Sequence, residues 1–119
     1  MTGLLAKATH LLRGKHAEDQ AQNFLSSKGL TLICRNYRCK QGELDLIMRD
    51  RKTLVVIEVR YRKSDTYGSA LESITRSKQA CISAATQHYL MTHPEDCPLR
   101  FDVIAITGNG EITWIQNAF

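Results

Sequence analysis

Hydrophobic and polar residues alternate along two neighbouring segments of the chain, 43–49 and 53–62. A period of two indicates strands, because successive side chains of a strand point to opposite faces. In the first segment the two predicted faces carry Leu44, Leu46 and Met48 and, on the other side, Glu43, Asp45 and Ile47. In the second they carry Val55, Ile57, Val59 and Tyr61 and, on the other side, Leu54, Val56, Glu58, Arg60 and Arg62. Acidic residues therefore interrupt an apolar pattern in both strands.

The short charged connection between these segments predicts an antiparallel hairpin. The connection could be a tip of two residues, Arg51 and Lys52, flanked by Asp50 and Thr53. If Asp50 then pairs with Thr53, Asp45 lies opposite Glu58 and Glu43 lies opposite Arg60. Arg-Lys is poor chemistry for the turns that two-residue tips prefer, so a four-residue tip is an equally good expectation. Either length puts the two carboxylates on one face, with Cβ atoms roughly 4.5–5.5 Å apart. That arrangement is repulsive unless a cation or a positive side chain lies between them.

The remaining pattern predicts two helices and three further strands. The first helix is expected from about Arg13 to Lys28, with Gly29 as its C-cap, and the second from about Ile74 to Met91. Strands are expected at 30–38, 99–107 and 111–116, and the polar segment 63–69 is expected to be a loop. The first three strands suggest an antiparallel meander, and the strand, helix and strand that follow favour a parallel pair. The sequence thus predicts an α/β sandwich in the order α-β-β-β-α-β-β around a mixed sheet.

Length and composition indicate an ordinary globular chain. Its 119 residues suffice for one domain over 1–119, with residues 1–12 frayed or loosely attached. No apolar run approaches the roughly 20 residues that cross a bilayer, and no signal-peptide core is present, so we expect a cytoplasmic protein with no membrane partner. The four cysteines lack zinc-site spacing, which favours reduced thiols. A net charge of +4 is compatible with nucleic-acid binding but does not establish it.

The acidic residues are the strongest candidates for chemistry. Asp45 and Glu58 on one sheet face are hard oxygen ligands of the kind that Mg²⁺ takes. Glu18 lies at the border of the first helix's buried stripe, from where a carboxylate can reach the sheet. A cationic Arg60 beside them could stabilise the charge that develops when a phosphodiester is attacked. The alternative is a solvated sheet face on which Glu58 pairs with Arg60 or Arg62.

Several basic residues are candidates for contact with nucleic acid, each with a structural alternative. Arg35 and Arg38 alternate with asparagine and tyrosine and could follow a phosphate backbone, or they could protect an edge strand from aggregation. Arg62 continues this basic character, and Arg76 and Lys78 could hold phosphate near the second helix or be ordinary exposed charges.

Two other kinds of polar residue are expected to be structural. Asp102 lies among apolar strand residues and is expected to be a hydrogen-bonded or paired carboxylate. The four histidines show no ligand spacing, which indicates surface or capping roles.

The central hairpin closely resembles the YraN family of small bacterial proteins, which are regarded as candidate endonucleases. The resemblance is carried by the motif G-E-x-D-L-I, followed after a short charged gap by V-V-I-E-V-R-Y-R. That family is similar to the Holliday-junction resolvases of the restriction-endonuclease-like fold. The likeness also covers Gly14 with Glu18, Arg35 with Asn36, Gly68, Ile74 with Lys78, and residues 100–103.

The resemblance implies a role for each acid of the hairpin. Asp45 and Glu58 would be the carboxylates that bind Mg²⁺ or Mn²⁺, and Glu18 would be a supporting acid. Arg60 stands where the nuclease motif ordinarily has lysine. A lysine can orient or help deprotonate the attacking water, whereas arginine stays charged and cannot act as a base. Arg60 therefore acts only electrostatically, or the protein is a slow or inactive nuclease.

Three functions are consistent with these residues. The first is a metal-dependent endonuclease that hydrolyses DNA phosphodiester bonds, including branched DNA such as Holliday junctions. The second is a non-catalytic nucleic-acid-binding protein that retains the nuclease fold. The third is an interaction or assembly protein whose acidic face meets a protein partner. Cutting two strands symmetrically needs two sites, so the resemblance also implies a homodimer.

Overall fold

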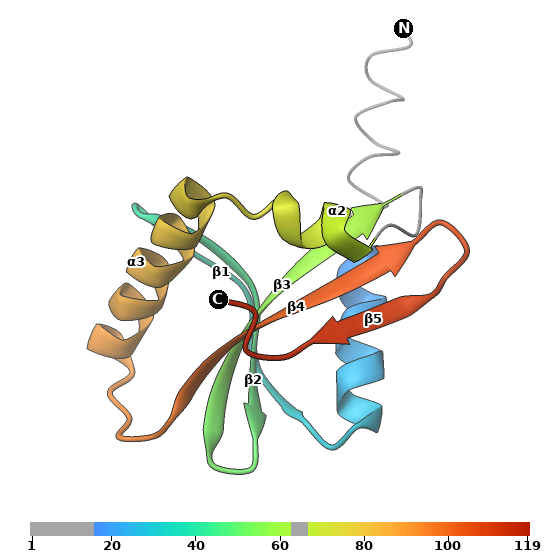
Figure 1. Ribbon diagram of the computed structural model, residues 1–119. Coiled ribbons are helices and arrows are strands. Elements are labelled where there is room, and N and C mark those ends of the chain that lie inside the picture. Colours follow the sequence, from blue (N-terminus) through green and yellow to red (C-terminus); the bar gives the residue numbers. More distant parts are fainter. Residues whose placement is uncertain (1–15, 63–66) are drawn as a thin grey trace, which may run out of the picture.

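A five-stranded mixed sheet forms the centre of the protein (Figure 1). The computed structural model describes residues 16–62 and 67–119, so the segment 1–12 that we expected to be frayed lies outside the described residues. The strands follow each other across the sheet in chain order, as β1 (Thr31–Cys39), β2 (Gly42–Asp50), β3 (Thr53–Arg62), β4 (Leu99–Thr107) and β5 (Ile112–Ile115). Pairing is antiparallel except between β3 and β4, which are parallel. The predicted meander and the predicted parallel pair are both confirmed.

Helices cover the sheet on both faces. An N-terminal helix is described over residues 16–27, and α3 spans Arg76–Thr92. The first helix ends as predicted at Gly29, whose φ of 99° is left-handed, with the Leu30 amide donating to the Leu25 carbonyl. The order α-β-β-β-α-β-β is therefore confirmed. No helix in the described part of the chain is long and apolar enough to cross a membrane.

The connection between β3 and α3 differs from the prediction. A short helix, α2 (Tyr67–Glu72), occupies part of the segment that we expected to be a loop, while residues 63–66 lie outside the described residues. The second predicted helix begins at Arg76 because Thr75 is its N-cap, accepting a hydrogen bond from the Lys78 amide. Ile74, predicted as the first helical residue, is instead buried in the core just before the cap.

Two apolar clusters lie on opposite faces of the sheet. One joins the N-terminal helix to the face of β3 that carries Val55 and Ile57. The other joins α3 to the opposite face, through Leu54 and Val56. This division is the alternation predicted for the second strand of the hairpin. Since Glu58 is an even-numbered residue of the same strand, it lies on the face that α3 covers.

A buried carboxylate links β4 to the end of the chain. Asp102 is fully buried and accepts hydrogen bonds from the Arg100 guanidinium, the Trp114 indole N–H and the Asn117 amide, all at 2.9 Å. Arg100 also pairs with Asp50 at 3.1 Å. The expectation that Asp102 is a structural, paired carboxylate is confirmed. The four cysteines are free thiols, as predicted.

We predict that Asp102→Ala lowers the free energy of unfolding by about 3–5 kcal/mol, because it removes the acceptor of the partly buried Arg100 guanidinium and of two further N–H donors. Urea unfolding followed by circular dichroism measures this loss. The matched control is Asp96→Ala, since Asp96 is an exposed aspartate. A loss no larger than that of the control would show that the network contributes little.

Candidate metal centre

The central hairpin brings Asp45 and Glu58 together at the point where its two strands separate. Asp50 pairs with Thr53, so the tip has two residues and the predicted register holds as far as the Leu46–Ile57 pair, where the described ladder ends. Arg51 adopts a left-handed φ of 58° to close this tip. The tighter of the two predicted tips is therefore the one that forms, although its residues do not favour it.

Beyond the last pair, the Asp45 carboxylate takes the place of the neighbouring strand's backbone. Its Oδ2 accepts a hydrogen bond from the Val59 amide at 2.9 Å, a donor that a continued ladder would direct to a carbonyl of β2. Because the ladder stops, the predicted pairing of Glu43 with Arg60 is wrong. Glu43 instead lies opposite Arg38 of β1, with 3.7 Å between their charged atoms.

A matching distortion of β1 accompanies this separation. Asn36 has a left-handed φ of 53°, which asparagine tolerates better than most residues, and the flanking pairs place it opposite Asp45. At the same point β2 changes the face that it buries. Leu46 packs against the N-terminal helix side, whereas Leu44 packs against the α3 side, so the prediction that both share one face is wrong. The kink directs the N-terminal end of β2, which carries Leu44, toward α3.

One oxygen of the buried Glu58 carboxylate lacks a hydrogen-bond donor in the part of the chain that the structure describes. The Glu58 side chain is 7% exposed, and within the described residues its Oε2 makes no hydrogen bond. Two cations lie close to this oxygen without reaching hydrogen-bond distance, the Arg60 guanidinium at 3.6 Å and the Lys78 ammonium at 3.7 Å. A buried carboxylate oxygen in this state is costly unless a further positive group completes its surroundings.

The pKa of Asp45 is raised to about 8 from its ordinary value near 3.8. Burial is the largest cause, followed by the hydrogen bond and the negative charge that Glu58 presents to it. The Val59 amide and the Lys78 charge act in the opposite direction and are outweighed. At neutral pH the raised pKa favours the protonated form of the Asp45 carboxyl group, and a divalent cation that binds this group would displace the proton.

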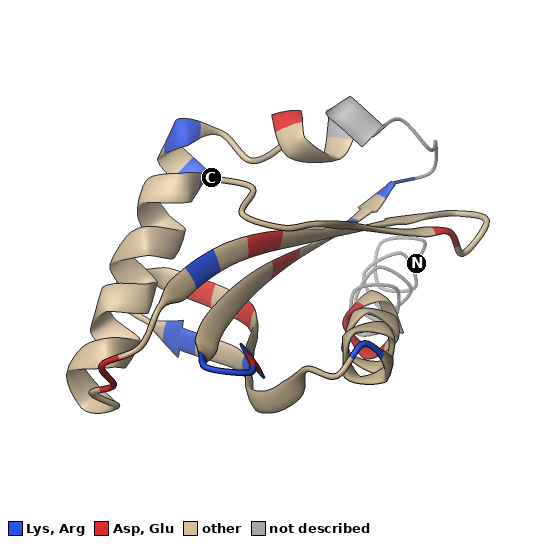
Figure 2. Ribbon diagram, turned by 60° about the horizontal axis from the view of Figure 1, so that its bottom comes forward, with Lys and Arg blue, Asp and Glu red and all other residues tan. Residues whose placement is uncertain are grey.

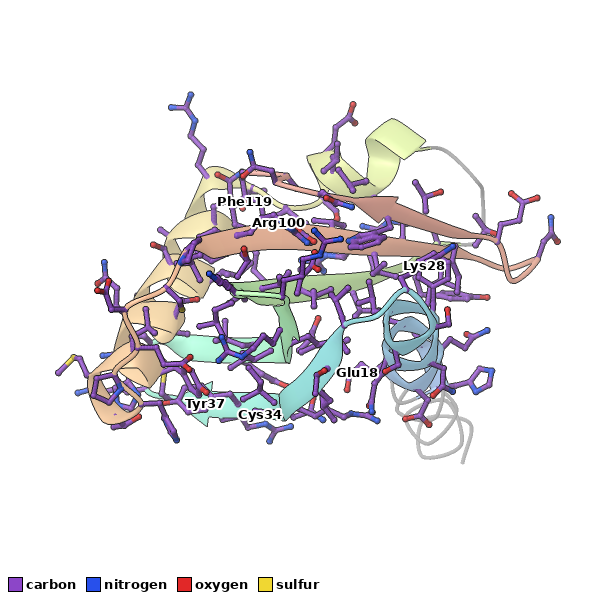
Figure 3. All side chains as sticks on the ribbon, turned by 90° about the horizontal axis from the view of Figure 1, so that it is seen from below. Glu18, Lys28, Cys34, Tyr37, Arg100 and Phe119 are labelled. Atoms are coloured by element: carbon purple, nitrogen blue, oxygen red, sulfur yellow. The ribbon has the colours of Figure 1, made fainter. Side chains whose placement is uncertain are left out.

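Glu18 approaches this pair from the other side of the kink. Burial and the charge of Asp45 raise its pKa, while Asn36 and Arg35 lower it. Figure 3 shows the Glu18 side chain leaving the N-terminal helix toward the first strands. Arg35 lies 3.6 Å from Glu18 and donates a hydrogen bond to Asp19 at 2.7 Å, so it holds the helix against β1.

The remaining predicted basic residues lie at different distances from the carboxylates. Arg76 and Lys78 are in the first turn of α3, which Figure 2 shows as basic. Arg60 and Arg62 follow Glu58 along β3, and the Nε atom of each is buried without a partner in the described structure. Arg38 is 77% exposed on the edge strand. The described residues thus bring Lys78 and Arg60 to Glu58 and leave Arg38 apart.

Sequence reasoning missed three contributors to the site. The Val59 amide is a backbone group and leaves no trace in residue type. Asn36 lies within a strand pattern, where an asparagine can indicate a left-handed kink. Phe119 lines the hollow beside Asp45 and Glu58 although it is far away in the chain. No local pattern could have placed it there.

The geometry fits a hard divalent cation bound by two carboxylates. The described residues contain no group of three histidine, cysteine or acidic side chains close enough to form a complete ligand set. Mg²⁺ commonly takes one or two carboxylates and keeps water and substrate phosphate as its other ligands, so two suffice. The buried Glu58 oxygen without a donor and the proton held at Asp45 are the two features that a cation would satisfy. The protein is therefore a small mixed α/β protein with a paired-carboxylate site at a sheet kink.

Comparison with known proteins gives the family. The family model described as "Uncharacterised protein family UPF0102" matches residues 17–106. The chain belongs to this family, which is the YraN family that the hairpin motif resembles. A UPF0102 protein of Saccharophagus degradans is 53% identical over 114 residues, covering 94% of this chain and 96% of its own length. One of Nitrosomonas eutropha is 52% identical over 107 residues, covering 90% and 92%. One of Legionella pneumophila is 47% identical over 110 residues, covering 90% and 93%.

The raised pKa predicts a pH-dependent stability. Between an ordinary carboxyl pKa and about 8, folded Asp45 keeps a proton that the unfolded chain releases, so the stability of the native protein falls as pH rises. Asp45→Asn removes the proton and the repulsion. We expect it to raise Tm at pH 8 by about 5 °C or more, and by less at pH 5, measured by calorimetry with a chelator present.

The matched control for this titration is the exposed Asp96→Asn, which should leave Tm nearly unchanged at both values of pH. An equal effect of Asp45→Asn at the two pH values would contradict a raised pKa of Asp45 in the folded protein.

Proposed function

We propose that this protein is a metal-dependent, endonuclease-like protein that hydrolyses DNA phosphodiester bonds, with Mg²⁺ or Mn²⁺ held by Asp45 and Glu58. The observation that carries the proposal is the buried carboxylate pair itself, in which one oxygen lacks a donor and one carboxyl group keeps a proton. Such a pair destabilises the fold, and costly or perturbed groups of this kind gather at functional sites. A bound Mg²⁺ would polarise a phosphoryl oxygen and acidify a water molecule.

The chain's own residues would perform the remaining tasks. Lys78, 3.7 Å from Glu58 and partly exposed on α3, can contact a non-bridging phosphate oxygen from the side opposite the sheet. Arg60, 3.6 Å from the same carboxylate, can stabilise the charge that accumulates during attack. The Val59 amide orients the Asp45 carboxylate toward Glu58. Glu18, with its raised pKa, is placed to act as a supporting acid or base.

The substrate is proposed to be DNA, including branched DNA. A chain of net charge +4 that exposes Arg38 and Arg76 can follow a phosphate backbone toward the carboxylate pair. The family resemblance to Holliday-junction resolvases supports a branched substrate and a homodimer with two sites.

A second candidate function is nucleic-acid binding without cleavage. The observation that favours it is Arg60, whose permanent charge lies beside Glu58 and cannot serve as a base. Under this alternative the protein binds DNA with an affinity that falls steeply between about 50 and 200 mM salt, and no metal produces a cut.

The deciding experiment is a cleavage panel with a labelled duplex and a labelled four-way junction, each with Mg²⁺, Mn²⁺ or chelator. We expect metal-dependent cleavage by the native protein and a loss of at least about 100-fold in Asp45→Ala, since the variant removes a metal ligand. The control Asp96→Ala should cleave at the native rate. Equal cleavage by Asp45→Ala would identify a contaminant, and tight binding without any cleavage would favour the second function.

Position 60 provides an independent prediction. We expect Arg60→Lys to cleave faster than the native protein by about tenfold or more, because lysine can orient and help deprotonate the attacking water. The comparison is made at saturating metal, with Arg62→Lys as the control, since Arg62 is the next arginine of the same strand face. If Arg60→Lys is slower than the native protein, arginine is the working residue at this position.

A further inference from the structure

Phe119 forms one wall of the hollow beside the carboxylate pair. The hollow lies between the outer half of β2, the middle of β3 and α3, and it is lined by Asp45, Glu58, Ile82 and Phe119, among others. The space that these side chains leave has no room for a water molecule. Figure 3 shows Phe119 near the first turns of α3, and the residue packs on the apolar cluster that α3 forms with the sheet.

The position of Phe119 is set by contacts of residues 117–119 with β4. The Asn117 amide donates to the Asp102 carboxylate at 2.9 Å, and the Ala118 amide donates to the Phe101 carbonyl at 2.7 Å. Asn117 has a left-handed φ of 52°, which turns the chain back after β5. The Phe119 ring then stacks on the Phe101 ring, with centroids 5.2 Å apart and planes 18° from parallel.

These contacts give the buried Asp102 network a second consequence. Arg100 and Trp114 fix the Asp102 carboxylate, and Asp102 in turn fixes the direction in which residues 117–119 leave β5. The network therefore places an aromatic ring beside Asp45 and Glu58, two residues that it does not itself contact.

The hollow is too narrow for a hydrated divalent cation. Mg²⁺ keeps several water molecules when it binds through one or two carboxylates. The walls formed by Leu44 and Ile82 belong to β2 and α3 and are buried in the core, so they cannot yield without loss of packing. Phe119 is only partly buried and belongs to no helix or strand. Its segment is joined to β4 through two hydrogen bonds, from the Asn117 amide to the Asp102 side chain and from the Ala118 amide to the Phe101 carbonyl. Its segment is the wall that can open at the lowest cost.

We propose that Phe119 is a cover over the carboxylate pair, and that it leaves this position when a divalent cation binds between Asp45 and Glu58. The proposal rests on the metal site described above. It makes residues 117–119 the element that limits the access of the cation, and of a phosphate that follows it, to the two carboxylates. Cation binding is then coupled to release of the segment from Asp102 and Phe101.

The test compares Mn²⁺ binding by the native protein, by Phe119→Ala and by Phe24→Ala, using calorimetry or the electron spin resonance of free Mn²⁺. Phe24→Ala is the matched control because it removes the same atoms from a partly buried ring on the opposite face of the sheet. We expect Phe119→Ala to bind Mn²⁺ about tenfold more tightly, since it no longer needs the cover to open, and Phe24→Ala to bind with the native affinity. Adding Asp45→Asn should abolish binding in every background.

A second measurement follows the segment in the native protein. Hydrogen exchange at the Asn117 and Ala118 amides, monitored by nuclear magnetic resonance, should accelerate when Mg²⁺ is added and should not change in Asp45→Asn. Unchanged or weaker Mn²⁺ affinity in Phe119→Ala, or unchanged exchange in the native protein on binding, would overturn the cover while leaving the metal site intact. Absence of Mn²⁺ binding by both the native protein and Phe119→Ala would overturn the metal site, and the cover with it.

Discussion

The separation of β2 from β3 at Asp45 is the constraint on which the candidate site depends. A continued ladder would satisfy the Val59 amide with a carbonyl and leave the two carboxylates facing each other on an ordinary sheet surface. Because the ladder ends at the Leu46–Ile57 pair, Asp45 can accept the hydrogen bond of the Val59 amide. The N-terminal end of β2 then packs toward α3. The left-handed Asn36 allows β1 to follow the same bend. A backbone irregularity thus brings Asp45 beside Glu58, which the alternation of β3 already places under α3.

Much of the fold follows from local patterns in the chain. The alternation along 53–62 determines which face each residue of β3 buries, and Gly29 ends the first helix as its conformational freedom suggests. The register of the hairpin follows from the length of its tip. What local patterns could not give is the kink, because it depends on β1, β2 and β3 at once. Because of the kink, the prediction that Leu44 and Leu46 share one face is wrong. The predicted loop over 63–69 is a separate error, since the short helix α2 begins at Tyr67.

The site divides in a similar way. Asp45 and Glu58 could be paired from the sequence because two acids in an apolar strand pattern are unusual, and Glu18 could be added from its place on the helix. Their proximity is described by the structure, whereas their roles as ligands and acids remain proposals. The Val59 amide and Phe119 could not be predicted, since one is a backbone donor and the other arrives through the long-range Asp102 network.

We propose that a divalent cation, when it binds between Asp45 and Glu58, displaces the proton that the raised pKa of Asp45 keeps on this carboxyl group. The most direct test is the number of protons released when Mg²⁺ binds at pH 7, obtained by calorimetry in buffers of different ionisation enthalpy. With the pKa of Asp45 raised to about 8, we expect close to one proton released per cation, and neither binding nor release in Asp45→Asn. Binding of Mg²⁺ with no proton release, or release that survives in Asp45→Asn, would contradict the claim.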